Sequence, residues 1–209
     1  MSTESTTIVS VGHAHRDDEG SKMGMWLFLF TELILFGGLF IVYAVYRFKF
    51  GQEFHLAAKE LDRFIGTINT LVLLTSSLTV AMSITAIQLG KKKLSLFLVG
   101  TTLILAFAFL VNKYFEWSHK IEHGIYPRSP ELMNKPPGEK LYFGLYYTMT
   151  GLHALHVIIG MVILTVVMVS IKKGTINKDS FVRLEAGGLY WHLVDIIWIF
   201  LFPLFYLLH

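Results

Sequence analysis

Apolar residues along this chain gather into five long runs that are separated by shorter polar stretches. A hydrocarbon core of roughly 30 Å requires about 20 mostly apolar residues from each helix that crosses it. No window alternates apolar and polar residues as a half-buried strand does. The pattern therefore predicts an all-α fold, a polytopic membrane bundle of five transmembrane helices. The five runs are about Met23–Tyr46, Phe64–Leu89, Leu94–Phe115, Leu141–Ile171 and Ala186–Leu208.

The chain divides into a polar tail, residues 1–21, and a single five-helix transmembrane domain, residues 22–209. The tail lacks the basic-then-apolar order of a cleaved signal peptide, so the first apolar run is expected to act as the insertion signal and to be retained. Of the 209 residues, 54% are hydrophobic and 16% charged, which favours a membrane protein over a soluble domain. With no cysteine, disulfides, thiolate metal sites and thiol catalysis are excluded.

Basic residues lie between the apolar runs, and their distribution predicts the topology. Lys91–Lys93 form one tight basic turn, and residues 172–183 add four more cations, whereas the connections at residues 47–63 and 116–140 mix cations with acids. The positive-inside rule then places the N-terminus and the tail in the cytoplasm and the C-terminus outside. The net charge of +3 is not concentrated in a nucleic-acid-binding patch. The proline-rich connection at residues 123–140 is expected to be irregular.

Ionisable side chains within apolar runs are costly in a bilayer, so each one is a candidate functional residue. At 1.5 Å per residue, Glu32 lies roughly 14 Å from the inner end of its run, while His192 and Asp195 lie roughly 9 and 14 Å from the inner end of theirs. The three can therefore share one layer. We expect Glu32 to pair with His192 or close to Asp195, as a polar clasp between helices. A proton-relay entry is the alternative.

The stretch "TGLHALHVIIGMVIL" carries His153 and His156 three residues apart, roughly 18 to 22 Å into the fourth run. A metal site would need further donors of matching depth, and the Glu-x-x-His pairs of a di-iron bundle are missing. Hydrogen bonds to Glu116 of the third run and to the serine-rich second run are the expected use of the two histidines. A metal or haem site at this pair stays as the alternative.

The second run has a small, polar stripe, because Asn69, Ser76 and Ser83 are spaced by sevens with Thr79 between them. Small residues allow helices to approach closely and hydroxyls bond across, so the stripe predicts a helix-packing face, with a water path as the alternative. In the last run, Tyr190, Trp191 and Tyr206 fall where an interfacial aromatic belt would lie. The sequence offers no nucleophile with a base and no sufficient set of metal ligands. No catalytic residue and no metal site are therefore predicted.

Five motifs follow one another along the chain: "KMGMWLFLFTELILFGGLF", "NTLVLLTSSLT", "KYFEWSHK", "YYTMTGLHALHVIIG" and "LYWHLVDIIWIFLFPLFYL". Their order and spacing resemble subunit III of haem-copper terminal oxidases, in the short five-helix bacterial form. The resemblance implies a subunit without haem, copper or a catalytic centre of its own, bound to the catalytic subunit I of an oxidoreductase that pumps protons. Such a subunit supports the stability of subunit I and proton uptake, with a bound phospholipid and dioxygen access as further expectations.

The resemblance also assigns the polar residues, none of which is a catalytic ligand in the family. Glu32 matches its intramembrane glutamate, Glu116 the acid of "YFEW", His153 and His156 its paired histidines, and His192 with Asp195 its "WHxxD" pair. "FTELILF" favours cytochrome c as the electron donor, and a bacterial plasma membrane is the implied location. The alternatives are a quinol oxidase subunit, an accessory protein of nitric oxide reductase, a small transporter and a haem-binding electron carrier.

Overall fold

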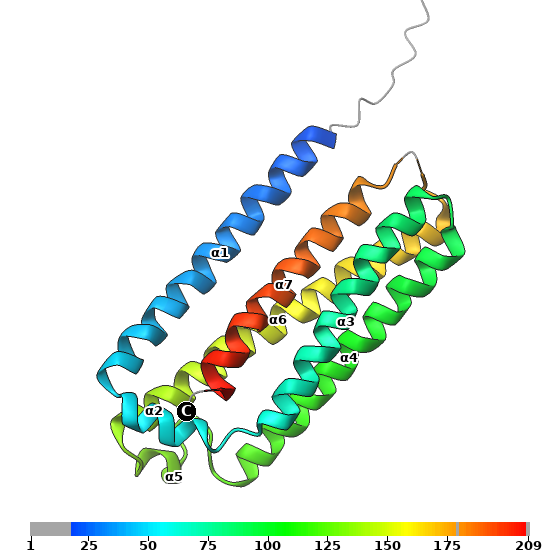
Figure 1. The fold of residues 1–209 in the computed structure, drawn as a ribbon. Helices are drawn as coiled ribbons and strands as arrows, with labels where there is room; N and C mark the ends of the chain where they lie inside the picture. The colour runs from blue at the N-terminus through cyan, green and yellow to red at the C-terminus, as the bar shows by residue number, and fades with distance from the viewer. Residues whose placement is uncertain (1–17, 179, 208–209) are drawn as a thin grey trace, which may run out of the picture.

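The computed structural model describes residues 18–178 and 180–207, and these residues form helices joined by short turns (Figure 1). Five helices are long and apolar enough to cross a membrane, which confirms the predicted all-helical fold with five long apolar segments. The polar tail up to residue 17 and the end of the chain beyond residue 207 lie outside the described residues. The helices are α1 (Asp18–Lys49), α2 (Gly51–Ala58), α3 (Arg63–Gln88), α4 (Lys92–Glu122), α5 (Pro130–Met133), α6 (Pro137–Lys173) and α7 (Val182–Tyr206).

The last helix, α7, occupies the centre of the bundle. It packs against α1, α3 and α6, and α4 completes the bundle by packing on α3 and α6. In Figure 1, α1 runs along one side of α7, and the α3–α4 pair covers the other. The central position explains why α7 fully buries Trp191 and Trp198. By contrast, α1 exposes most of its large apolar side chains, as a helix that borders lipid does.

Two glycines allow the close approach of α7 to its neighbours. A Cβ atom on Gly160 of α6 would lie 2.8 Å from the indole of Trp191, and one on Gly188 of α7 would lie 2.9 Å from Ile84 of α3. Real Cβ atoms do not approach other heavy atoms so closely, so a larger residue at Gly160 would collide with the rigid indole. At Gly188 the end of the flexible Ile84 side chain would have to move instead. Glycine at position 160 therefore limits the distance between α6 and α7.

The long helices extend beyond the runs predicted from hydropathy. Helix α1 begins at Asp18 rather than Met23, α4 ends at Glu122 rather than Phe115, and α6 begins at Pro137 rather than Leu141. Hydropathy detects only the part of a helix that is apolar, whereas the backbone continues helical through polar residues until a cap or a turn ends it. These extensions change which residues lie at the same level in the bundle.

Two short helices, α2 and α5, lie at one end of the bundle (Figure 1). The α5 helix lies in the connection at residues 123–140 that was expected to be irregular. A carboxylate oxygen of Glu53 in α2 accepts from the backbone N–H of Gly138, in the first turn of α6. Lys135 lies between Glu60 and Glu139, 3.1 Å from the latter. Burial lowers the pKa of Lys135, but the hydrogen bonds to Glu60 and Glu139 outweigh burial and raise the pKa above its ordinary value.

Candidate functional site: three buried polar clusters

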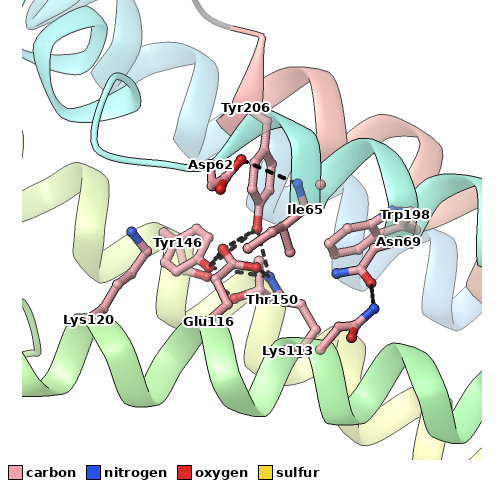
Figure 2. A network of polar contacts seen from close by, with 12 residues as sticks. Asp62, Ile65, Asn69, Lys113, Glu116, Lys120, Tyr146, Thr150, Trp198 and Tyr206 are labelled. Carbon is pink, nitrogen blue, oxygen red and sulfur yellow. Dashed lines mark hydrogen bonds and ion pairs between the residues drawn. The ribbon is translucent and has the colours of Figure 1, made fainter.

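The first cluster joins α4, α6 and α7 near the end that carries α2 and α5 (Figure 2). Lys113 Nζ donates to Glu116 Oε2 at 3.1 Å, to the Tyr146 hydroxyl at 3.2 Å and to the Tyr206 hydroxyl at 2.7 Å. Both tyrosine hydroxyls donate in turn to Glu116 Oε1 at 2.5 Å. An ammonium group has three donors. Each donor of Lys113 is therefore used, and both oxygens of Glu116 accept.

Aromatic rings enclose this cluster. Lys113 Nζ lies 5.1 Å from the ring centroid of Trp198 and 5.2 and 5.4 Å from those of Tyr146 and Tyr206. These distances are within the range of cation–π attraction. Lys113 is 4% exposed and Glu116 is 6% exposed, so one residue without the other would leave an uncompensated buried charge. The arrangement stabilises the contact between three helices and leaves no free polar atom for a substrate.

The second cluster links α1 to α6 through Glu32 and His156. His156 Nδ1 donates to the carbonyl of Leu152 at 2.7 Å, and its Nε2 lies 2.7 Å from Oε2 of Glu32. Because Nδ1 already carries a proton, the second contact needs one more, held either on Nε2 or on the carboxyl. The pair therefore shares one proton between α1 and α6.

The predicted pairing of Glu32 with His192 or near Asp195 is wrong. Helices α1 and α6 both begin before the apolar runs that predicted them. Glu32 therefore lies roughly 21 Å along α1 and His156 roughly 28 Å along α6, so each residue is close to the middle of its helix. Since the two helices run in opposite directions, the two residues meet at one level. The depth of roughly 14 Å that the apolar run gave for Glu32 is therefore too small.

His153 faces a different environment from His156. Its ring is fully buried, with centroid distances of 5.6 Å to Phe109 and 5.2 Å to Trp198. Among the described residues, neither ring nitrogen has a hydrogen-bond partner. The expected hydrogen bonds of His153 and His156 to Glu116 and to the second run are therefore wrong. Glu116 has Lys113, Tyr146 and Tyr206 as its partners instead.

The third cluster lies between α3 and α7. His192 Nδ1 is 2.6 Å from the Ser77 hydroxyl. Asp195, one turn further along α7, is 2% exposed, and the Ser77 hydroxyl lies beside it. Within the described part of the chain, no hydrogen bond reaches either carboxylate oxygen of Asp195. His192 and Asp195 were predicted from the sequence, whereas Ser77 was missed because it lies beside the seven-residue stripe rather than on it.

The residues of the stripe on α3 contact two neighbouring helices. Asn112 of α4 donates to Asn69 at 2.9 Å, Trp191 of α7 donates to Ser76 at 3.0 Å, and Thr79 bonds to Thr102 of α4 at 2.8 Å. Ser83 is buried, and its hydroxyl bonds back to the carbonyl of Val80. The stripe thus lies where α3 meets α4 and α7.

The predicted aromatic belt on the last run is wrong. Tyr190, Trp191 and Tyr206 are at most 1% exposed, and each donates a hydrogen bond inside the bundle. Because α7 is central, its ends face neighbouring helices and not the membrane interface. Tyr146 and Tyr206 were missed as members of the first cluster. Both could have been suspected from the sequence, because a tyrosine that is buried in an apolar run needs a hydrogen-bond partner for its hydroxyl.

Among residues 18–178 and 180–207, no three His, Asp or Glu side chains lie close enough together to hold a metal ion. The three clusters instead connect helices through hydrogen bonds of polar side chains. This fold and these sites define a polytopic membrane protein with five long helices and polar clasps between them. Comparison with known proteins gives the family.

The model of the family "Cytochrome c oxidase subunit III" matches residues 1–209. A cytochrome c oxidase subunit 3 from Thermostichus vulcanus is 30% identical over 203 residues, which cover 97% of this chain and 94% of the relative. A probable quinol oxidase subunit 3 from Staphylococcus aureus is 27% identical over 208 residues, or 100% of this chain and 97% of the relative. The chain belongs to the cytochrome c oxidase subunit III family, whose members are subunits of haem-copper oxidases.

A third relative is a longer protein. A haem-copper oxidase subunit I+III from Aeropyrum pernix is 31% identical over 192 residues, which cover 89% of this chain but 22% of that protein.

Proposed function

We propose that this chain is the non-catalytic subunit III of a proton-pumping haem-copper oxidase that reduces dioxygen to water. In this role it binds the catalytic subunit I, keeps that subunit stable during turnover, and supports proton uptake and dioxygen access. The haems and the copper belong to the partner subunits. The observation that carries the proposal is the match of the family over the whole length of the chain.

Association with subunit I is supported by the Aeropyrum relative, whose name places subunits I and III in one chain. Two units that are fused in one protein lie close together in it. The long exposed apolar surface of α1 gives this chain ample area for contact with another membrane subunit as well as with lipid.

We propose cytochrome c as the electron donor, in line with the name of the Thermostichus relative. The name of the Staphylococcus relative supports a quinol instead, and this is the second candidate. The purified complex distinguishes them. Oxygen consumption that is driven by reduced cytochrome c supports the first, and consumption driven only by a quinol supports the second.

The proposed location is a bacterial plasma membrane, with residues 1–21 as a cytoplasmic tail ahead of a single five-helix domain. In this topology the turn at Lys91–Lys93 and the α6–α7 turn face the cytoplasm. The cap formed by α2 and α5 and the C-terminus then lie outside. A bound phospholipid is supported by a groove between α1 and α7 of about 660 Å³, which is lined mostly by apolar residues and also by Arg47.

Removing this chain from its oxidase tests the proposed role. We expect a complex that lacks it to begin oxygen reduction at a near-normal rate and then to lose activity during turnover, with the purified chain restoring the lifetime. As the control, the tag alone is added to the depleted complex in place of the chain, and the lifetime of activity measured there is the baseline. A complex whose activity is equally long-lived without the chain contradicts the proposal.

A further inference from the structure

A cavity of about 410 Å³ lies between α1, α3 and α7, near the N-terminal ends of α1 and α7. Lys22 of α1 and Glu185 of α7 line it and face each other at 3.9 Å, with side chains that are 57% and 31% exposed. An ion pair so exposed is hydrated, so water reaches this part of the cavity. His192 also lines it, beside apolar residues that include Ile84 and Leu189.

His192 connects this cavity to the interior of the bundle. Its Nδ1 lies 2.6 Å from the Ser77 hydroxyl, so Nε2 is the ring nitrogen left for water in the cavity. Beyond Ser77 lies the Asp195 carboxyl, which is 2% exposed and has the Ser77 hydroxyl beside it. Among the described residues, no side chain or backbone group forms a hydrogen bond of normal geometry to its oxygens. Burying a carboxyl group without a partner is expensive, so such a group calls for a specific explanation.

We propose that Asp195 is a proton-binding site, loaded from the aqueous phase at the α1/α7 end through His192 and Ser77. A hydroxyl group can accept one proton and donate another, and a neutral imidazole can do the same through its two nitrogens. His192 and Ser77 are in hydrogen-bond contact, and Asp195 lies next to Ser77, so the three side chains line a path from a hydrated cavity to a buried acid.

In the loading direction, a hydrated proton in the cavity binds His192 Nε2 and leaves water behind, while Nδ1 releases its own proton to the Ser77 oxygen. The Ser77 hydroxyl passes its original proton to the Asp195 carboxylate. The products are a neutral carboxylic acid, an unchanged hydroxyl and a neutral imidazole that carries its proton on Nε2. Rotation of the imidazole, which turns the protonated nitrogen toward Ser77, resets the ring for the next proton.

The site deepens the proposed support of proton uptake and rests on that proposal for its use in the oxidase, but not for its existence. Glu32 is not part of the relay, because it is engaged with His156. Glu116 is not part of it either, because both of its oxygens accept hydrogen bonds in the first cluster.

Infrared spectroscopy tests the relay on the chain purified from its membrane with the subunits that accompany it. A protonated carboxyl has a C=O band that shifts when its proton is replaced by deuterium. We expect one such band to move on labelling with ¹³C-aspartate and to vanish in Asp195→Asn. The isotope label assigns the band to an aspartic acid even where the variant fails to fold.

The rate of the deuterium shift then reports the path. We expect Ser77→Ala to slow it by about a hundredfold, the lower end of what one positioned proton-transfer group contributes. Thr75→Val is the matched control, because Thr75 lies on the same helix, is exposed and bonds only to its own backbone, and its shift should keep the rate of the unchanged chain. The absence of an aspartic acid band, or equal rates in Ser77→Ala and the unchanged chain, overturns the proposal. Either result leaves co-purification with subunit I, the test of the subunit assignment, unaffected.

Discussion

Among single residues, several of the buried ionisable side chains lie in pairs or hydrogen-bonded networks. Lys113 and Glu116 are both buried and use their polar atoms on each other and on two tyrosines. Removing one member of such a network leaves the other charge without compensation, whereas removing both relieves most of the penalty. The network therefore contributes to the specific packing of the three helices that it joins.

Lys113→Met should lower the free energy of unfolding by about 3 kcal/mol, because Glu116 then keeps its buried charge without a cation. The double variant Lys113→Met/Glu116→Gln should recover more than half of this loss. Thermal unfolding in detergent, followed by circular dichroism, measures both. Lys93→Met, at an exposed position, is the control for the loss of a lysine. A double variant as unstable as the single one contradicts the account.

At the Glu32–His156 pair, a hydrogen-bond partner should be enough to hold α1 on α6. Glu32→Gln keeps a group that can donate to His156 Nε2, whereas Glu32→Leu leaves that nitrogen buried and unpaired, at a cost of about 1 to 3 kcal/mol. We expect the glutamine variant to unfold close to the temperature of the unchanged chain and the leucine variant well below it. Equal losses in the two variants would mean that the carboxyl itself is required.

Between helices, the distance of closest approach depends on glycines at the contact. Gly160 of α6 lies against Trp191 of α7, so a methyl group there collides with the indole. Gly144 of the same helix has no neighbouring atom within 4 Å of where a Cβ would lie. The two positions therefore differ in packing while sharing the same helix.

We expect Gly160→Ala to destabilise the chain by about 1 to 3 kcal/mol, as other over-packed positions do. Gly144→Ala should leave the stability unchanged or raise it slightly, since alanine favours the helix by up to about 1 kcal/mol. The difference between the two unfolding temperatures is the measurement. If both alanine variants behave alike, the contact of Gly160 with Trp191 does not limit the approach of α6 and α7.

The cap formed by α2 and α5 has a pH-dependent contact at Lys135. The acids Glu60 and Glu139 raise the pKa of this lysine above its ordinary value near 10.5. Its contribution to stability is therefore complete below about pH 10.5 and disappears as the pH rises through the higher pKa of the folded state. The unfolding temperature of the unchanged chain should exceed that of Lys135→Met at neutral pH, and the two should converge in strong alkali. A difference that does not change with pH contradicts this role.

At the scale of the whole molecule, the sequence was sufficient for the five long apolar helices, because each needs only a run of apolar residues. It was not sufficient for the level of each polar group. Glu32 was assigned to the wrong partner because the helix starts at Asp18 and Pro137 lie outside the apolar runs. Tyr206 was placed at the membrane surface because nothing in the last run shows that α7 is central.

The proposed role makes this chain a structural subunit beside a separate haem-and-copper catalytic subunit. Gentle detergent purification through a tag on this chain, with identification of the accompanying proteins and a reduced-minus-oxidised spectrum, tests that role. We expect a large haem-and-copper subunit to be recovered with the chain, and the chain alone to show no haem bands. A chain that purifies alone and carries its own haem would contradict it, and would make His153 and His156 the first ligands to examine.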